Sequence, residues 1–183
     1  MAVQNQTDLS EVIRGCCENE SRAQSILYKE LYGLAMNTAM RYSRDEDDAA
    51  NIVTAGFVKI FRNIKSFDAG KGSIHGWLKK IIINEALDFL KVRQKFSRYE
   101  EVEESAVAIA DSGMTEKLSA EELLELTRML PLTTQTVFNM YVLEGYTHRE
   151  IAGILGISDG TSKWHLNQAR KFLQQEIINL SNT

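Results

Sequence analysis

The spacing of hydrophobic side chains along this chain is helical from end to end. Apolar residues recur at every third or fourth position in most windows, and no window keeps the strict alternation of a half-buried strand. The pattern therefore predicts an all-α protein. The expected helices cover residues 21–42, 46–65 and 74–95 in the first part of the chain and residues 117–129, 133–144, 148–155 and 159–179 in the second.

Three interruptions divide this helical pattern. The first is the glycine-rich stretch FDAGKGSIHG, which we expect to be a mobile loop. The second is a polar, acidic stretch over residues 97–116, and the third is a turn at Pro131, the only proline. We therefore predict two small helical domains, 8–96 and 117–181, joined by an acidic linker.

The second domain contains a local pattern typical of two helices joined by a tight turn. Thr147 and Glu150 have the spacing of a capping box, in which the two side chains satisfy free amides at a helix start. Gly156 is placed to end that helix in a left-handed conformation, and Ser158 is suited to cap the next one. This pattern predicts a helix-turn-helix, whose second helix would enter the major groove of DNA.

The second helix of this motif has two chemically different faces. At about 100° per residue, one side collects the residues that could pack inward, Ser162, Leu166, Ala169 and Leu173. The other side carries groups that suit base edges and phosphates: Trp164, Asn167, Gln168 and Lys171, flanked by Thr161, Lys163, His165 and Arg170. A solvated helix face is the alternative interpretation, but an exposed tryptophan among amides and cations favours DNA binding.

The net charge of −4 is unevenly distributed along the chain. Residues 59–98 hold ten basic and three acidic side chains, whereas residues 99–130 hold two basic and nine acidic ones. A local positive excess of this kind is the electrostatic footprint of a nucleic-acid-binding surface. Residues 131–183 hold four side chains of each sign, so we expect the helix-turn-helix to bind DNA weakly on its own.

These motifs resemble the extracytoplasmic-function group of bacterial sigma factors. The stretch LPLTTQTVFNMYVLEGYTHREIAGILGISDGTSKWHLNQARKFL is similar to their fourth conserved region, which reads the minus-35 promoter element. The stretches SRDEDDAANIVTAGFVKIFRNI and GSIHGWLKKIIINEALDFLKVRQKF are similar to parts of their second conserved region. One departure is Ser162, where the family often has valine; we expect its hydroxyl to bond back to a carbonyl, or the inner face to be slightly looser.

The resemblance implies a sigma factor that binds core RNA polymerase and directs promoter-specific initiation of transcription. Helix 46–65 would dock on the clamp helices of the polymerase. The family usually has a more acidic, glutamine-containing surface here, and four residues depart from it: Ala50, Asn51, Thr54 and Ala55. The expected polymerase-binding residues are Asp48, Asn51, Ile52, Thr54, Ala55 and Phe57. An anti-sigma factor is a further expected partner, and we expect the free chain to be a monomer.

The same resemblance implies that helix 74–95 and the loop before it open the minus-10 element. Holding an unstacked strand requires cations for the backbone, amides for a base edge and a loop that can enclose a flipped base. The expected minus-10 residues are Lys71, His75, Trp77, Lys80, Asn84, Asp88 and Lys91. Freedom in the loop would come from Gly70, Gly72 and Gly76, and the inward face of the helix from Leu78, Ile82 and Phe89.

Other function classes find little support in the sequence. There is no plausible nucleophile–base pair, and the fragment GKGS lacks the spacing of a phosphate-binding loop. The three histidines have no partners at metal-ligand spacing, so we expect no catalytic activity, no metal and no cofactor. An ordinary regulator of duplex DNA and an interaction adaptor without DNA function remain the alternatives to a sigma factor.

The remaining features concern the cellular context and regulation. Cys16 and Cys17 are adjacent, which predicts two reduced thiols near the end of a helix. No segment reaches the ~18–20 apolar residues that cross a bilayer, and the N-terminus lacks a secretory signal, so we expect a cytoplasmic protein without membrane insertion.

The acidic linker could fold over the cationic surface of the free protein through Glu100, Glu101, Glu103 and Glu104; the alternative is a solvated spacer.

Overall fold

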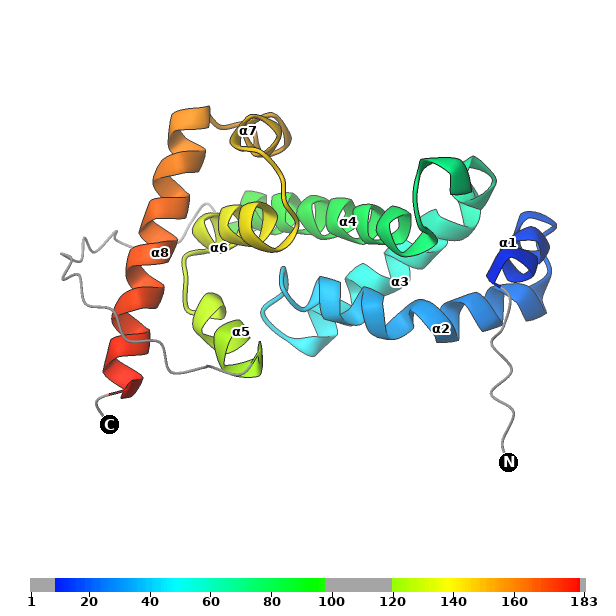
Figure 1. The fold of residues 1–183 in the computed structure, drawn as a ribbon, viewed down its shortest axis with the longest axis horizontal. Helices are drawn as coiled ribbons and strands as arrows, with labels where there is room; N and C mark the ends of the chain where they lie inside the picture. The colour runs from blue at the N-terminus through cyan, green and yellow to red at the C-terminus, as the bar shows by residue number, and fades with distance from the viewer. Residues whose placement is uncertain (1–8, 98–119, 182–183) are drawn as a thin grey trace. The chain divides into compact units, whose positions relative to one another are not determined.

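A computed structural model of the chain describes residues 9–97 and 120–181 (Figure 1). These residues form helices and turns without a strand, which confirms the expected all-α class. The chain separates into two compact units, residues 1–100 and 101–183. None of the described helices is both long enough and apolar enough to span a membrane.

The first unit is a bundle of four α-helices. They are α1 (Leu9–Cys17), α2 (Ser21–Ala39), α3 (Glu46–Asn63) and α4 (Ile74–Ser97), with the short 3₁₀ turns η1 (Ile64–Ser66) and η2 (Ala69–Lys71) between α3 and α4. Helix α2 packs against α1, α3 and α4, and α3 packs against α4 (Figure 1). The core is formed by aliphatic side chains from three helices: Leu27, Leu31, Ile52, Val53, Ile60, Leu78, Ile82 and Ile83.

Local sequence signals explain the start of α3 and its close packing on α4. The Asp45 carboxylate accepts a hydrogen bond from the Asp48 backbone amide at 2.8 Å and so caps the helix. The acidic residues of the first turn also lie where the helix dipole favours negative charge. Further along, Gly56 is buried against α4, where a Cβ atom would overlap the Ile82 side chain. The glycine therefore allows the two helices to approach closely.

The second unit contains α5 (Ala120–Arg128), α6 (Leu132–Phe138), the π-helical segment η3 (Asn139–Leu143), α7 (His148–Leu155) and α8 (Asp159–Ser181). The long helix α8 packs against α5, α6 and α7 (Figure 1). The expected helix 133–144 is thus an α-helix that continues as a π-helix. The core side chains of the second unit include Val137, Met140, Ile151, Leu166, Ala169 and Leu173.

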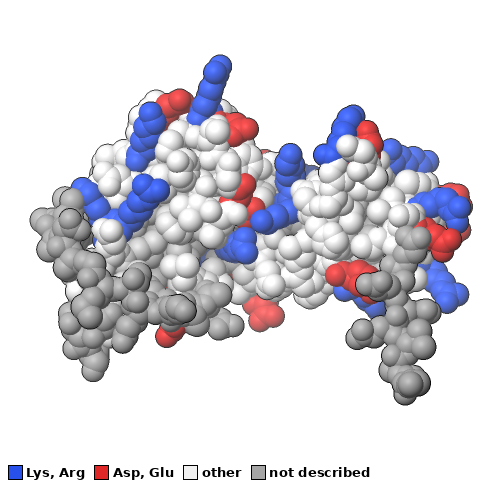
Figure 2. Space-filling model, in the orientation of Figure 1, with Lys and Arg blue, Asp and Glu red and all other residues white. Residues whose placement is uncertain are grey.

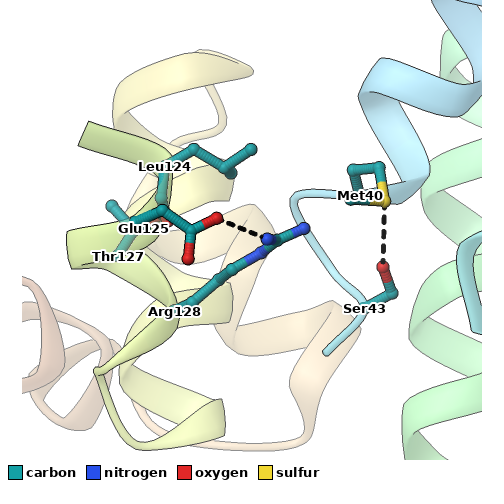
Figure 3. A network of polar contacts seen from close by, with 6 residues as sticks. All are labelled: Met40, Ser43, Leu124, Glu125, Thr127 and Arg128. Carbon is teal, nitrogen blue, oxygen red and sulfur yellow. Dashed lines mark hydrogen bonds and ion pairs between the residues drawn. The ribbon is translucent and has the colours of Figure 1, made fainter. Parts of the chain in front are cut away.

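Short polar contacts stabilise individual helix ends in each unit (Figure 3). Within α5, the Arg128 guanidinium lies 2.6 Å from the Glu125 carboxylate, and the Thr127 hydroxyl donates to the Leu124 carbonyl at 2.8 Å. After α2, the Ser43 hydroxyl lies 4.0 Å from the Met40 sulfur.

The structure bears on two of the expected connections, the loop before α4 and the acidic linker. Helix α4 begins at Ile74. Gly76, which we expected in the loop, therefore belongs to the first turn of the helix. Gly72 does take a left-handed φ of 153°, which only glycine adopts readily, and it therefore provides the bend before α4. The acidic linker lies almost wholly outside the described residues, including Glu100, Glu101, Glu103 and Glu104.

Candidate nucleic-acid interface

The start of α7 and the turn between α7 and α8 are built by the residues that the sequence singled out. The Thr147 amide donates to the Glu150 carboxylate at 2.8 Å, and the Thr147 hydroxyl accepts from the Glu150 amide at 3.3 Å, which completes the capping box. Gly156 ends α7 with φ 70° and ψ 32°, in the left-handed region. The Ser158 hydroxyl then accepts a bond from the Thr161 amide at 3.0 Å and caps α8.

The inner face of α8 packs as predicted. Ser162, Leu166, Ala169 and Leu173 are all buried in the second unit. The rest of the unit covers this face, and the side chains on the other side of the helix therefore determine what α8 presents to solvent. Helix α8 is thus amphipathic, with one buried face and one face directed to solvent.

The outer face of α8 exposes four of the eight predicted minus-35 residues. Lys163, Asn167 and Arg170 are exposed at helical spacing, and Trp164 keeps 45% of its surface accessible. Gln168 and Lys171 are half-buried on the same side. The surface over α7 and α8 carries both basic and acidic side chains, which agrees with the balanced charge of residues 131–183 (Figure 2).

Two of the predicted minus-35 residues are engaged within the protein. The Thr161 hydroxyl lies 2.9 Å from that of Ser158, within the cap of α8. The Nδ1 atom of His165 lies 2.9 Å from the Thr134 hydroxyl on α6. The His165 ring also packs edge-to-face with the Trp164 ring, with ring centroids 4.8 Å apart. These contacts join Thr161 to the cap of α8 and His165 to α6, so both side chains bind other residues of the second unit.

The Ser162 hydroxyl has a partner that the sequence did not suggest. Its oxygen lies 3.0 Å from Nδ1 of His148, the first residue of α7. The His148 ring also stacks on Tyr141 from η3, with ring centroids 4.5 Å apart and 21° between the planes. The residue that departs from the family pattern therefore connects the two helices of the motif.

In the first unit, local polar contacts connect residues of the loop before α4. The Asp68 carboxylate accepts from the Gly70 amide at 2.9 Å, and its other oxygen lies 3.4 Å from the Lys71 ammonium. The Ser73 hydroxyl accepts from the Gly76 amide at 3.2 Å and so caps the first turn of α4. Lys71 and His75 remain exposed on this loop and on the start of the helix.

Helix α4 presents one exposed polar strip. Lys80, Asn84, Asp88 and Lys91 are all exposed and recur at helical spacing. Trp77 is half-buried at the start of this strip, and its ring lies 5.7 Å from that of Phe67 in the loop. On the inward side, Leu78 and Ile82 are buried as predicted, whereas Phe89 is only half-buried.

An ion-pair cluster joins this strip to α3. The Lys59 ammonium lies 2.5 Å from the Glu85 carboxylate and 3.5 Å from that of Asp88. The hydrogen bond that Lys59 donates to Glu85, followed by the charges of both carboxylates, raises the pKa of Lys59 above its usual value. Asp88, predicted to contact DNA, is therefore also a structural partner of α3.

The predicted polymerase-binding residues of α3 lie on two sides of the helix. Asn51 and Thr54 are exposed, and Asp48 and Ala55 are half-buried. Ile52 and Phe57 lie in the core with 1% and 3% of their surfaces accessible. They do not reach the surface of α3, because the helical period turns them into the core of the bundle, so the prediction that they contact the polymerase directly is not compatible with their burial.

The comparisons with known proteins agree with this geometry. Residues 27–96 match the family model described as Sigma-70 region 2, and residues 120–173 match the one described as Sigma-70, region 4. The two matched segments correspond to the two units of the structure and together cover more than half of the chain.

Several relatives and a solved structure are similar over most of their length. The ECF RNA polymerase sigma-E factor of Haemophilus influenzae is 23% identical over 172 residues, which cover 87% of this chain and 90% of the relative. RNA polymerase sigma factor SigV of Bacillus subtilis is 24% identical over 139 residues, 76% of this chain and 81% of its own. The sigma factor RpoE of Bartonella quintana, solved in complex with the anti-sigma factor NepR, shares the fold with a TM-score of 0.50 and 23% identity, covering 81% of this chain and 94% of that one. The chain therefore belongs to the sigma-70 family, as a sigma factor of the extracytoplasmic-function type, a class of DNA-binding transcription initiation factors.

Proposed function

We propose that this sigma factor binds core RNA polymerase through α3, reads the minus-35 element with α8, and opens the minus-10 element with α4 and the preceding loop. The observation that carries the proposal is that each unit exposes one helix face suited to nucleic acid. On α8 this face lies opposite a fully packed inner side, and on α4 it lies opposite the core of the bundle.

The α8 face suits duplex DNA in the major groove. Asn167 and Gln168 carry amides that can pair with adenine, and Lys163 can reach guanine or a phosphate. Arg170 and Lys171 add cations for the backbone. Because residues 131–183 have no net positive charge, contacts with DNA phosphates contribute too little binding free energy for this unit to hold DNA alone. Its attachment to polymerase supplies the missing affinity.

The α4 strip suits a separated strand. Lys80 and Lys91 provide cations on either side of Asn84, whose exposed amide can pair with a base edge. Trp77 and His75 lie at the loop end of the strip, where an unstacked base would find a ring to stack on. Capturing such a base favours the open over the closed promoter, and no covalent step by this chain is required.

Docking on the polymerase falls to the exposed side of α3, around Asn51 and Thr54. In this proposal the chain acts by binding alone, phosphodiester synthesis belongs to the polymerase, and the site of action is the cell interior. An anti-sigma factor is the expected regulatory partner, as the complex of the Bartonella sigma factor illustrates for that protein. The free chain is expected to be a monomer.

Run-off transcription with purified core polymerase and a library of upstream genomic fragments tests the proposal. We expect transcripts with defined 5′ ends that require this protein and are absent with core polymerase alone. If the protein co-elutes with core polymerase but yields no such transcripts, it is an adaptor. If it binds duplex DNA but not core polymerase, it is an ordinary regulator, and the proposal is wrong in either case.

A further inference from the structure

We propose that His148 is a positioning residue that sets the angle of α8 in the groove through its bond to Ser162, and thereby determines minus-35 discrimination. The inference rests on the proposed reading of the minus-35 element by α8. The observation behind it is the 3.0 Å contact between His148 Nδ1 and the Ser162 hydroxyl across the helix-turn-helix.

The site of this contact is the part of α8 that matters most for recognition. Ser162 is the fourth residue of the helix, and the N-terminal residues of a recognition helix are those that reach base edges. Its neighbours Lys163 and Trp164 are exposed on the outer face of α8, the face proposed to read the minus-35 element. A small tilt at Ser162 would displace both side chains, and base readout tolerates displacements of only about 0.5 Å.

A hydrogen bond fixes this geometry in a way that apolar packing does not. Ser162 is fully buried, with 0% of its surface accessible, so its hydroxyl needs a partner inside the protein. A valine at this position would fill the space without a directional preference, because hydrophobic contacts are non-directional whereas hydrogen bonds restrict both distance and angle. A valine would therefore be sufficient for the stability of the unit, whereas the serine also fixes the orientation of α8.

The His148 side chain is itself held in place by a third element, η3. Its ring stacks on Tyr141 of η3 at 4.5 Å, so the ring plane is restricted before it meets Ser162. One turn further along α8, His165 bonds to Thr134 of α6 at 2.9 Å. The first two turns of the reading helix are thus anchored at two points by directional contacts to different elements.

The test measures discrimination and not binding alone. Holoenzyme assembled from core polymerase and the full chain is used to select a preferred upstream sequence from a randomised duplex pool, and the ratio of affinities for the preferred and a scrambled duplex is then determined. We expect His148→Ala and Ser162→Val each to lower this ratio about tenfold, the scale of one lost base contact. The double variant should lose no more than either single variant, because the two groups act through one bond.

Two further variants separate positioning from stability. His148→Asn keeps a polar atom near the position of Nδ1 and should retain most of the wild-type ratio. Thr136→Val removes another buried hydroxyl of this unit, one that donates to the Leu132 carbonyl within its own helix, and should leave the ratio unchanged. If a single variant fails to fold, the apolar pair His148→Leu with Ser162→Val restores packing and should still show the lowered ratio.

Two results would overturn the inference, and they differ from each other. If wild-type holoenzyme selects a sequence and the folded variants keep its ratio within about twofold, the bond does not set the reading geometry. If the wild-type holoenzyme selects no sequence at all, the proposed function fails, and this inference fails with it.

Discussion

The Lys59 ammonium on α3 lies 2.5 Å from the Glu85 carboxylate on α4, and this pair connects the proposed polymerase-docking helix to the proposed strand-opening helix. Only 16% of the Glu85 side chain is accessible, whereas 46% of the Lys59 side chain is. Removal of the lysine would therefore leave a mostly buried carboxylate without its counter-ion, which is more costly than the loss of an exposed pair.

Lys59→Met should lower the free energy of unfolding of the first unit by ~1 kcal/mol, as expected for a partly screened pair. The same change at the exposed Lys29 of α2 is the matched control and should have little effect. Urea titration in a Trp164→Phe background, in which Trp77 fluorescence reports the first unit, measures both. Equal effects of the two substitutions would show that the pair adds nothing to stability.

The pH dependence of this pair follows from the raised pKa of Lys59. Because the folded value lies above the ordinary value of 10.5, the contribution is present at neutral pH and is lost only as the pH rises through the folded pKa. The difference between wild type and Lys59→Met should therefore stay constant from pH 7 to about 10 and shrink above it. A difference that shrinks between pH 7 and 9 would contradict this assignment.

Gly56→Ala should destabilise the first unit by about 1–3 kcal/mol, because the added methyl group would overlap the buried Ile82 side chain. Gly33 on α2 provides the opposite case, since a methyl group there would meet no atom within 4 Å. Gly33→Ala should stabilise the helix by about 0.5–1 kcal/mol through its higher helix propensity. Urea titrations should separate the two variants in opposite directions; a neutral Gly56→Ala would mean that the end of the Ile82 side chain moves aside without cost.

The two cysteines should differ in reactivity although they are adjacent. Cys16 is buried, and burial, followed by the charges of Cys17 and Glu20, raises the pKa of its thiol. Since the thiolate is the reactive form, Cys17 should react first with a disulfide reagent at pH 8, and Cys16 only as the protein unfolds. Cys17→Ser should remove the fast phase and Cys16→Ser should keep it; two thiols of equal rate in the folded protein would refute the assignment.

Two substitutions on α8 should have different effects on DNA binding. Gln168→Ala should cost about 1–3 kcal/mol at one base position of the selected minus-35 sequence if its amide reads a base. Arg170→Ala should weaken binding to all sequences alike and reduce the salt dependence, as a phosphate contact does. Holoenzyme affinities for single-base variants of the selected duplex, measured at two salt concentrations, distinguish these roles. An equal loss on every sequence for Gln168→Ala would make it a backbone contact.

The parts of the structure that could be predicted from sequence are those set by neighbouring residues. The capping box of Thr147 and Glu150, the left-handed Gly156 and the Ser158 cap each depend on residues within one turn of a helix. The burial of Leu166 and Ala169 follows from helical period alone. Local signals of this kind are sufficient to define a helix-turn-helix.

The contacts that could not be predicted join residues far apart in the chain. His148 and Ser162 are 14 residues apart, and Thr134 and His165 are 31 apart, so nothing in either local sequence indicates the partner. No bounds were predicted for helix α1, although Cys16 and Cys17 were expected near the end of a helix, because its nine residues offer only a short period. The π-helical continuation of α6 was also missed, because it differs from an α-helix only in its hydrogen-bond register.

Permanganate footprinting of promoter complexes tests the central claim most directly, namely that α8 recognises duplex DNA while α4 holds the separated strand. Holoenzyme carrying Asn84→Ala should still bind the promoter duplex but should show much weaker reactivity of thymines in the minus-10 element, whereas Gln168→Ala should reduce binding and reactivity together. A fully reactive bubble with the Asn84→Ala protein would contradict the account.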